Sequence, residues 1–63
     1  MFKNLRVELV KKGLNNGNVG EIINETADEV SSRIEGKTEF TLAEMLAIRN
    51  NLFPGMTLQY LFA

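Results

Sequence analysis

Side chains that could do chemistry are concentrated in the middle of this 63-residue chain. Glu25, Asp28 and Glu29 supply three neighbouring carboxylates, and Arg33 and Lys37 follow with positive charge. The chain contains no cysteine and no histidine, which excludes disulfides, Cys/His zinc sites and catalytic groups built on those residues. Adjacent acids without a ligand loop do not make a metal site either. The residues therefore argue against an enzyme, a metal site and a cofactor.

A short helix that begins after Thr26 is expected to position these side chains. Thr26 and Glu29 have the three-residue spacing of a capping box. Val30 and Ile34 are spaced for burial on one face, and Gly36 suits the end of the helix. The pattern predicts a helix of about two turns with a buried and an exposed face.

A second short helix is predicted just before the first, from Asn16 to Ile23, with Asn15 as its N-cap. Asn24 tolerates the left-handed conformation that ends a helix. Gly20 lacks a side chain and would let two crossing helices approach closely. Two short helices joined by a tight turn are typical of the helix-turn-helix, whose second helix can enter the major groove of DNA.

Three further helices are expected around this pair. Apolar residues at three- and four-residue spacing predict a helix from Phe2 to Lys12, which Gly13 ends. Thr41 opens another capping box, and that helix continues to the break at Phe53-Pro54-Gly55. Thr57 caps a last short helix. The chain is therefore predicted to be all-α, with five helices in a single domain that covers residues 1–63.

The charge balance is close to neutral, with seven basic and eight acidic residues and a net charge of −1. Nucleic-acid binders usually carry an excess of Lys and Arg, although a near-neutral chain can bind if its basic groups cluster on one face. No apolar run approaches the ~18 residues of a membrane span, and no basic-then-apolar leader opens the chain. These features predict a cytoplasmic protein without a membrane partner.

The ordered set of elements resembles the Xre-type helix-turn-helix family, which includes lambda repressor and Cro-like proteins. The resemblance rests on Gly13-Leu14, Gly20 and Gly36-Lys37 at their positions in the helix order. The second half is more specific, because Gly36 to Leu42 and Phe53 to Met56 are similar to small stand-alone proteins of Gram-positive phages and prophages. The resemblance covers nearly the whole chain. It implies a compact five-helix lambda-repressor-like domain.

This resemblance also implies a function and the residues that perform it. The function is that of a sequence-specific transcriptional regulator that binds double-stranded DNA as a homodimer, on a short symmetric operator, with no small-molecule substrate. The family's DNA-facing positions fall on Asn16, Ala27, Asp28, Ser32, Arg33, Lys37 and Thr38. Asn16 and Lys37 are expected to contact phosphate. Ala27, Asp28, Ser32 and Arg33 are expected to face the major groove.

The chain departs from the family pattern around the turn. The usual glycine of the turn is Asn24, the apolar residue after it is Glu25, and the second helix of the pair has an acidic start. Asp28 has two open interpretations, since its carboxylate could accept a hydrogen bond from cytosine or stabilise the helix dipole. For Glu29 the dipole and the cap are the favoured interpretation. The acids also motivate an alternative function, in which the fold is a protein–protein interaction module with weakened or lost DNA binding.

Two expectations concern the outer helices. Arg6 and Glu8 on the first helix are expected to form a surface or interhelical ion pair. Tyr60 and Phe62, near the end of the chain, are expected to supply a dimer contact, because the last helix often does so in this fold class.

Overall fold

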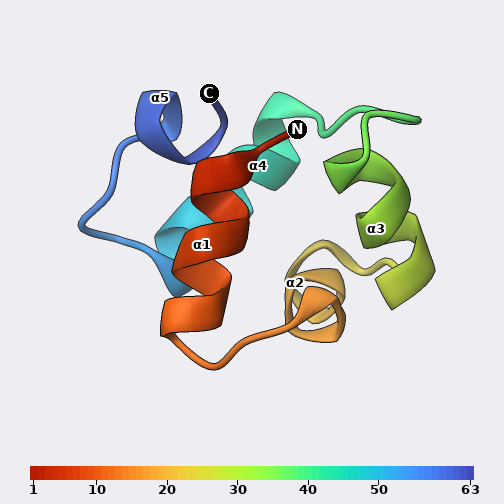
Figure 1. The fold of residues 1–63 in the computed structure, drawn as a ribbon, viewed down its shortest axis with the longest axis horizontal. Helices are drawn as coiled ribbons and strands as arrows, with labels where there is room; N and C mark the ends of the chain where they lie inside the picture. The colour runs from red at the N-terminus through yellow and green to blue at the C-terminus, as the bar shows by residue number, and fades with distance from the viewer.

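All five predicted helices are present in the computed structural model, which describes residues 1–63 and contains no strand (Figure 1). The chain measures 26 × 21 × 19 Å along its principal axes, so the prediction of a compact all-α fold is confirmed. The helices are α1 (Lys3–Lys11), α2 (Asn16–Ile23), α3 (Ala27–Ile34), α4 (Leu42–Leu52) and α5 (Leu58–Leu61).

Side-chain caps fix where the central helices begin. At α2, the Asn15 side chain accepts a hydrogen bond from the Asn18 N–H, and the Asn18 side chain accepts one from the Asn15 N–H. Thr41 and Glu44 form the same reciprocal pair at α4. At α3, Thr26 Oγ1 accepts one backbone hydrogen bond at 3.1 Å, and the expected return bond is not formed. Each such cap stabilises its helix by about 1 kcal/mol.

The turn between α2 and α3 depends on two special positions. Asn24 has a left-handed backbone with φ 60°, as predicted. A Cβ on Gly20 would lie well inside van der Waals contact with the carbonyl oxygen of Glu25. The prediction that Gly20 permits a close approach is therefore correct, but its neighbour is the backbone of the turn rather than a crossing helix. The Glu25 N–H also donates to the Gly20 carbonyl at 2.9 Å, which holds the turn against the end of α2.

The core is drawn from all five helices and from the segments between them. Its nine buried apolar residues are Leu5, Leu9, Val19, Val30, Ile34, Phe40, Ile48, Phe53 and Leu61. At one end of this core, the rings of Phe2, Phe40 and Phe62 pack edge to face, with centroids 5.6 to 5.8 Å apart. Phe2 has a left-handed φ of 55°, and its contacts in this cluster offset the strain of that conformation.

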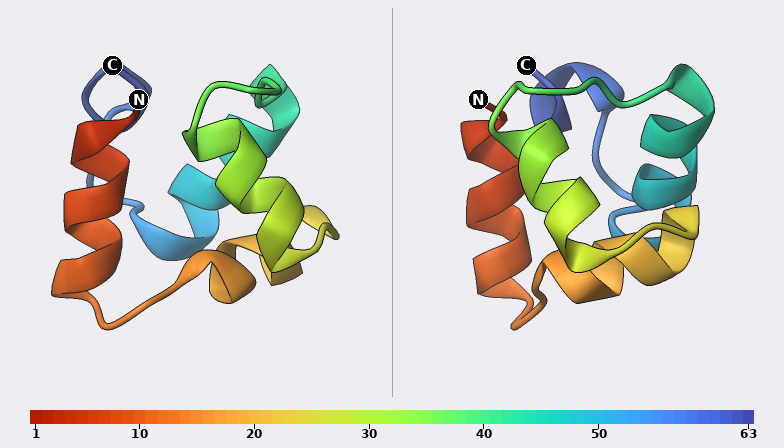
Figure 2. Two further views of the ribbon diagram at one scale, coloured as in Figure 1. Left: turned by 45° about the vertical axis from the view of Figure 1, so that its right-hand side comes forward. Right: turned by 90° about the vertical axis from the view of Figure 1, so that its right-hand side faces the viewer.

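Long-range hydrogen bonds join α1 to the end of the chain, and the two termini lie near each other in every view (Figures 1 and 2). Asn4 Nδ2 donates to the Tyr60 carbonyl at 2.8 Å, and the Tyr60 hydroxyl donates to Glu8 Oε2 at 2.7 Å. Glu8 is 7% exposed, and Lys11 lies 3.6 Å from the same carboxylate. The expected pair between Arg6 and Glu8 is therefore wrong, because Glu8 points inward to α5 and its basic partner is one turn later.

Candidate nucleic-acid interface

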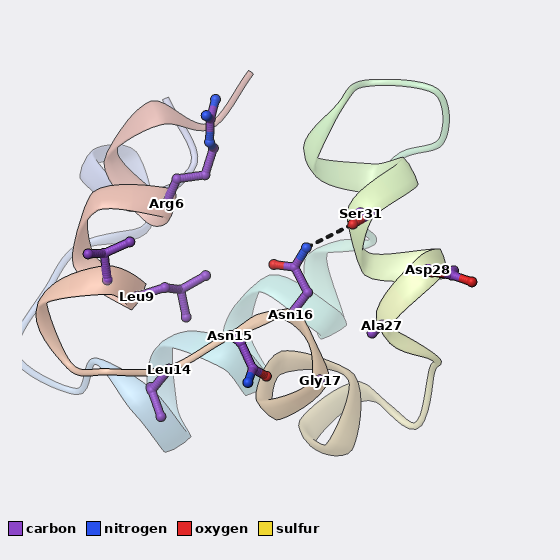
Figure 3. Close-up of a pocket in the computed structure, with 10 residues that line it drawn as sticks. Arg6, Leu9, Leu14, Asn15, Asn16, Gly17, Ala27, Asp28 and Ser31 are labelled. Carbon is purple, nitrogen blue, oxygen red and sulfur yellow. Dashed lines mark hydrogen bonds between the residues drawn. The ribbon is translucent and has the colours of Figure 1, made fainter.

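An open groove of about 610 Å³ lies between α1, the beginning of α2 and the exposed side of α3 (Figure 3). Leu9 contributes an apolar wall from α1, and Arg6 is the one cation among the residues that line the groove. Three of the predicted DNA-facing residues, Asn16, Ala27 and Asp28, also line it. The structure thus brings these three together from the first turns of α2 and α3, although Asn16 and Ala27 are eleven positions apart in the sequence.

Asn16 joins the two helices of the predicted pair. Its Nδ2 donates to the Ser31 hydroxyl at 2.9 Å, a part-buried bond between α2 and α3 (Figure 3). The side-chain donor is consequently used within the chain, while the carbonyl oxygen of the same amide makes no hydrogen bond. The backbone N–H groups of Asn16 and Gly17 also have no acceptor, as is normal in the first turn of a helix. Such free N–H groups attract anions at a helix N-terminus.

The exposed start of α3 is acidic. Val30 and Ile34 are buried, as predicted, so the opposite face of α3 points to solvent. Ala27 and Asp28 are exposed on that side, and the Asp28 carboxylate points outward, away from α1 (Figure 3). Asp28 and Glu29 both lie in the first helical turn, where the dipole stabilises negative charge by about 0.3–1 kcal/mol. Neither of these two acids forms an ion pair.

Arg33 does not lie on the exposed face, which differs from the prediction. Its side chain is only 12% exposed and forms ion pairs with Glu44 at 2.7 Å and with Glu25 at 3.3 Å. The guanidinium also lies over the Phe40 ring, 5.9 Å from its centroid. Both hydrogen-bonding ends of the fork are therefore engaged, and the cation ties α3 to the preceding turn and to α4. The expectation that Arg33 faces the major groove stays a prediction, and a base contact would require these ion pairs to open.

The remaining predicted residues lie at the far end of α3, away from the groove. Ser32 is half-buried, and its carbonyl accepts hydrogen bonds from the backbone N–H groups of Lys37 and Thr38 at 2.9 and 3.4 Å. These bonds close the end of the helix, as in a C-terminal cap. Lys37 is exposed and lies 3.2 Å from Glu35, so solvent screening weakens that pair. Thr38 is exposed beside a different cavity, one that Arg33 also lines.

Arg6 is the functional candidate that the sequence reasoning missed. It is exposed and forms no ion pair, and it borders both the groove and a smaller hollow shared with Asn16 and Glu35. A signal was available in the charge distribution, since four of the seven basic residues but only one of the eight acidic residues precede Gly13. That asymmetry indicates a basic α1, although it does not identify which of its cations lies beside α3.

The two predicted dimer residues are largely used within the chain. Phe62 is half-buried in the aromatic cluster with Phe2 and Phe40. Tyr60 is 41% exposed, but its hydroxyl donates to Glu8. This hydrogen bond, with smaller contributions from desolvation and from the negative charge of Glu8, raises the pKa of Tyr60 above its usual 10.0. The contacts of Phe62 already account for its apolar side chain without a second copy.

Comparison with protein-family models, with curated proteins and with solved structures finds no match to this chain. No helix has both the length and the apolar character needed to cross a membrane. No group of three or more His, Cys, Asp or Glu side chains is arranged to hold a metal ion. The groove and the charges around it are the features of this chain that bear on its function.

Proposed function

We propose that this protein is a sequence-specific DNA-binding transcriptional regulator of phage or prophage type, in which α2 and α3 form a helix-turn-helix. The observation that carries the proposal is the rigid joining of these helices by the Asn16–Ser31 hydrogen bond and by the close fit of Gly20 against the turn. These contacts hold the exposed start of α3 beside the free N–H groups of α2. In a helix-turn-helix, the recognition helix enters the major groove while the N-terminus of the other helix can bind a backbone phosphate. The proposal includes binding as a dimer to a short symmetric operator.

Phosphate contacts in this proposal come from both sides of α3. The free N–H groups at the start of α2 and the unpaired guanidinium of Arg6 hold one strand, and Lys37 with Thr38 holds the other. At the bases, the Ala27 methyl suits contact with the methyl group of thymine, and the Asp28 carboxylate accepts from cytosine N4. Arg33 has no base contact here, because its role is to hold α3 in place.

The small number of free cations sets the expected strength of the electrostatic contribution. Only Arg6 and Lys37 are placed to neutralise phosphates, and each such contact changes the slope of log affinity against log salt by about −0.9. A protomer should therefore show a slope of about −2, which is weak for a DNA-binding protein. Sequence preference must then come largely from the Ala27 and Asp28 contacts.

Fluorescence anisotropy with the DNA that flanks the protein's own gene, measured over a range of salt, tests the proposal. Arg6→Ala and Lys37→Ala should each reduce the salt slope by about one. Lys11→Ala is the matched control, because Lys11 is on α1 but does not line the groove. Absence of saturable binding at low salt, in protein that is folded by circular dichroism, would refute the proposal.

Asp28→Asn separates base recognition from a purely local role. If Asp28 accepts from a cytosine, the substitution should lower affinity for the preferred sequence by about 1–3 kcal/mol and relax its specificity. If the carboxylate serves only the helix dipole, the loss of negative charge should tighten binding to every sequence alike. The second result would remove Asp28 from the proposed reading surface and leave the phosphate contacts intact.

A second candidate is a protein–protein interaction module built on the same fold. The specific observation in its favour is that the exposed part of α3 carries the acids Asp28 and Glu29, while its one cation, Arg33, is held by Glu25 and Glu44. A surface of this charge repels phosphate and suits a basic protein partner. The anisotropy titration distinguishes the two candidates, because the interaction module predicts no DNA binding even at the lowest salt.

A further inference from the structure

The outer face of α1 is basic and partly apolar, and no other element of the chain covers it. Lys3, Val7 and Lys11 lie four residues apart along one ridge of the helix, and Arg6 and Val10 form the next ridge. These five residues line a shallow hollow to which no other helix contributes. Both views of Figure 2 show α1 at the edge of the molecule. This set of five residues is called the α1 face below.

Apart from Lys11, which lies in the last turn of α1 and 3.6 Å from Glu8, the residues of the α1 face do little for the folded chain itself. Lys3 lies in the first turn of α1, where the helix dipole disfavours positive charge. Val7 and Val10 are β-branched, which lowers helix propensity, and their exposure (40% and 77%) means that core packing gives little in return. Lys3 and Arg6 form no ion pair. Contacts within the chain do not explain these residue types at positions 3, 6, 7 and 10, and a contact with a partner explains them more simply.

Charge determines what could cover the α1 face. Three cations surround the two valines, and the only acid of α1, Glu8, is 7% exposed and bonded to Tyr60. A symmetric contact between the α1 faces of two copies would place like charges opposite one another, which is destabilising. A nucleic-acid backbone would satisfy the cations but leave the valines without apolar contacts. A surface that combines carboxylates with apolar side chains satisfies both.

We propose that the α1 face docks an acidic amphipathic helix of a partner protein. The partner's apolar stripe packs over Val7 and Val10, and its flanking Asp or Glu side chains pair with Lys3, Arg6 and Lys11. The spacing of the two ridges suits helix–helix packing at an axial separation of about 8–10 Å. This inference goes beyond the proposed DNA-binding function, because Lys3, Val7 and Lys11 do not line the groove.

The test is an NMR titration of the full isotope-labelled chain with a designed helical peptide. The probe is a peptide of about 18 residues, long enough to be helical, with leucines on one face and glutamates beside them. Its matched control carries lysine in place of every glutamate. The glutamate peptide should shift the amide signals of residues 3–11 in a saturable way, and the lysine peptide should not. An equal response to both peptides, or no response to the glutamate peptide, overturns the proposal.

Substitutions establish that the α1 face itself is responsible. Val10→Ser should weaken binding of the glutamate peptide by about tenfold, because most of a buried valine's apolar contact is lost. Lys3→Glu should weaken it as well while favouring the α1 dipole, so a loss of fold cannot imitate that result. Leu42→Ser is the control, since Leu42 is an exposed apolar residue (62%) on α4. Equal weakening by Leu42→Ser overturns the assignment.

Experiment can also distinguish two other possible occupants of the α1 face, duplex DNA and a second copy of the chain. If duplex DNA shifts the signals of Lys3 and Val7, which do not line the groove, as strongly as the peptide does, the face is a nucleic-acid surface and the proposal fails. If sedimentation shows self-association that Val10→Ser abolishes, the occupant is a second copy and the proposal fails again. The DNA-binding function is tested separately through Lys37, which is not part of the α1 face. Failure of one proposal therefore leaves the other intact.

Discussion

Arg33 is expected to stabilise the fold through its two carboxylate partners, and removing its charge tests this role. The side chain is 12% exposed, and its closer partner Glu44 is 18% exposed, so the pair lies between the surface and the interior. Exposed pairs contribute about 0–1 kcal/mol, and breaking a fully buried pair costs about 3–5 kcal/mol. Glu44 keeps its hydrogen bond from the Thr41 N–H when Arg33 is removed, which limits the loss. We therefore expect Arg33→Met to lower the free energy of unfolding by about 2 kcal/mol.

In a domain of this size, such a loss should lower the midpoint of thermal unfolding by about 8–16 °C. A double-mutant cycle with Glu44→Gln isolates the pair, because glutamine can still cap α4, and a coupling energy of about 1–2 kcal/mol is expected. Glu25→Gln should cost less than Glu44→Gln, since the Glu25 contact is longer and its side chain is 35% exposed. Urea unfolding followed by circular dichroism provides the measurement. A coupling energy near zero, together with a loss of DNA affinity in folded Arg33→Met, would refute this reasoning and restore Arg33 as a DNA contact.

Three further substitutions test other parts of the fold. Gly20→Ala should destabilise the protein by about 1–3 kcal/mol, despite the better helix propensity of alanine, because the added Cβ meets the backbone of the turn. The control is Gly55→Ala, where a Cβ meets nothing within 4 Å and stability should change little. Similar losses of stability in thermal melts of the two variants would contradict the close fit at the turn. The raised pKa of Tyr60 means that the folded state favours the neutral phenol, so its contribution to stability is present below pH 10 and is lost as pH rises through the raised pKa. Tyr60→Phe should remove that part of the alkaline decline, and urea midpoints compared with the parent between about pH 8 and 11 measure it; an unchanged pH profile would argue against the hydrogen bond to Glu8. Phe62→Ala should lower the free energy of unfolding by about 2–3 kcal/mol, because it removes two edge-to-face ring contacts. If stability is unchanged and sedimentation shows that self-association is lost, Phe62 belongs to a dimer interface instead.

The helix boundaries were predictable because their causes are local. Asn15, Thr26, Thr41 and Thr57 each accept a hydrogen bond from a backbone N–H only three residues later, so the signal lies within four positions of the sequence. The left-handed turn at Asn24 is equally local, since it depends on that residue's own backbone preference. Together with the apolar spacing, these signals are sufficient to predict five helices. They do not predict which helices lie side by side.

Where side-chain contacts at the candidate site differ from expectation, the cause is not local. The partners of Arg33 are eight positions before it and eleven after it, and Tyr60 pairs with Glu8 across fifty-two positions. A charged side chain near the end of a helix looks the same in sequence whether it is free or paired with a residue of another helix. Arg6 is the reverse case, because the sequence suggests an ion pair with Glu8 and the structure leaves its guanidinium unpaired beside the groove. Whether a charged side chain is free to bind a ligand depends on tertiary contacts, and these cannot be read from composition.

Arg6 links the two proposed surfaces, because it borders the groove and is also part of the α1 face. A guanidinium that pairs with a carboxylate of a docked helix is no longer available to a phosphate, and its charge is neutralised by the partner. Binding of DNA and docking of an acidic helix should therefore oppose each other, and thermodynamic linkage requires that each ligand weakens the other by the same factor. Arg6→Ala should weaken both interactions and abolish most of this antagonism. If the antagonism persists in Arg6→Ala, its cause is the bulk of the docked helix rather than competition for one cation.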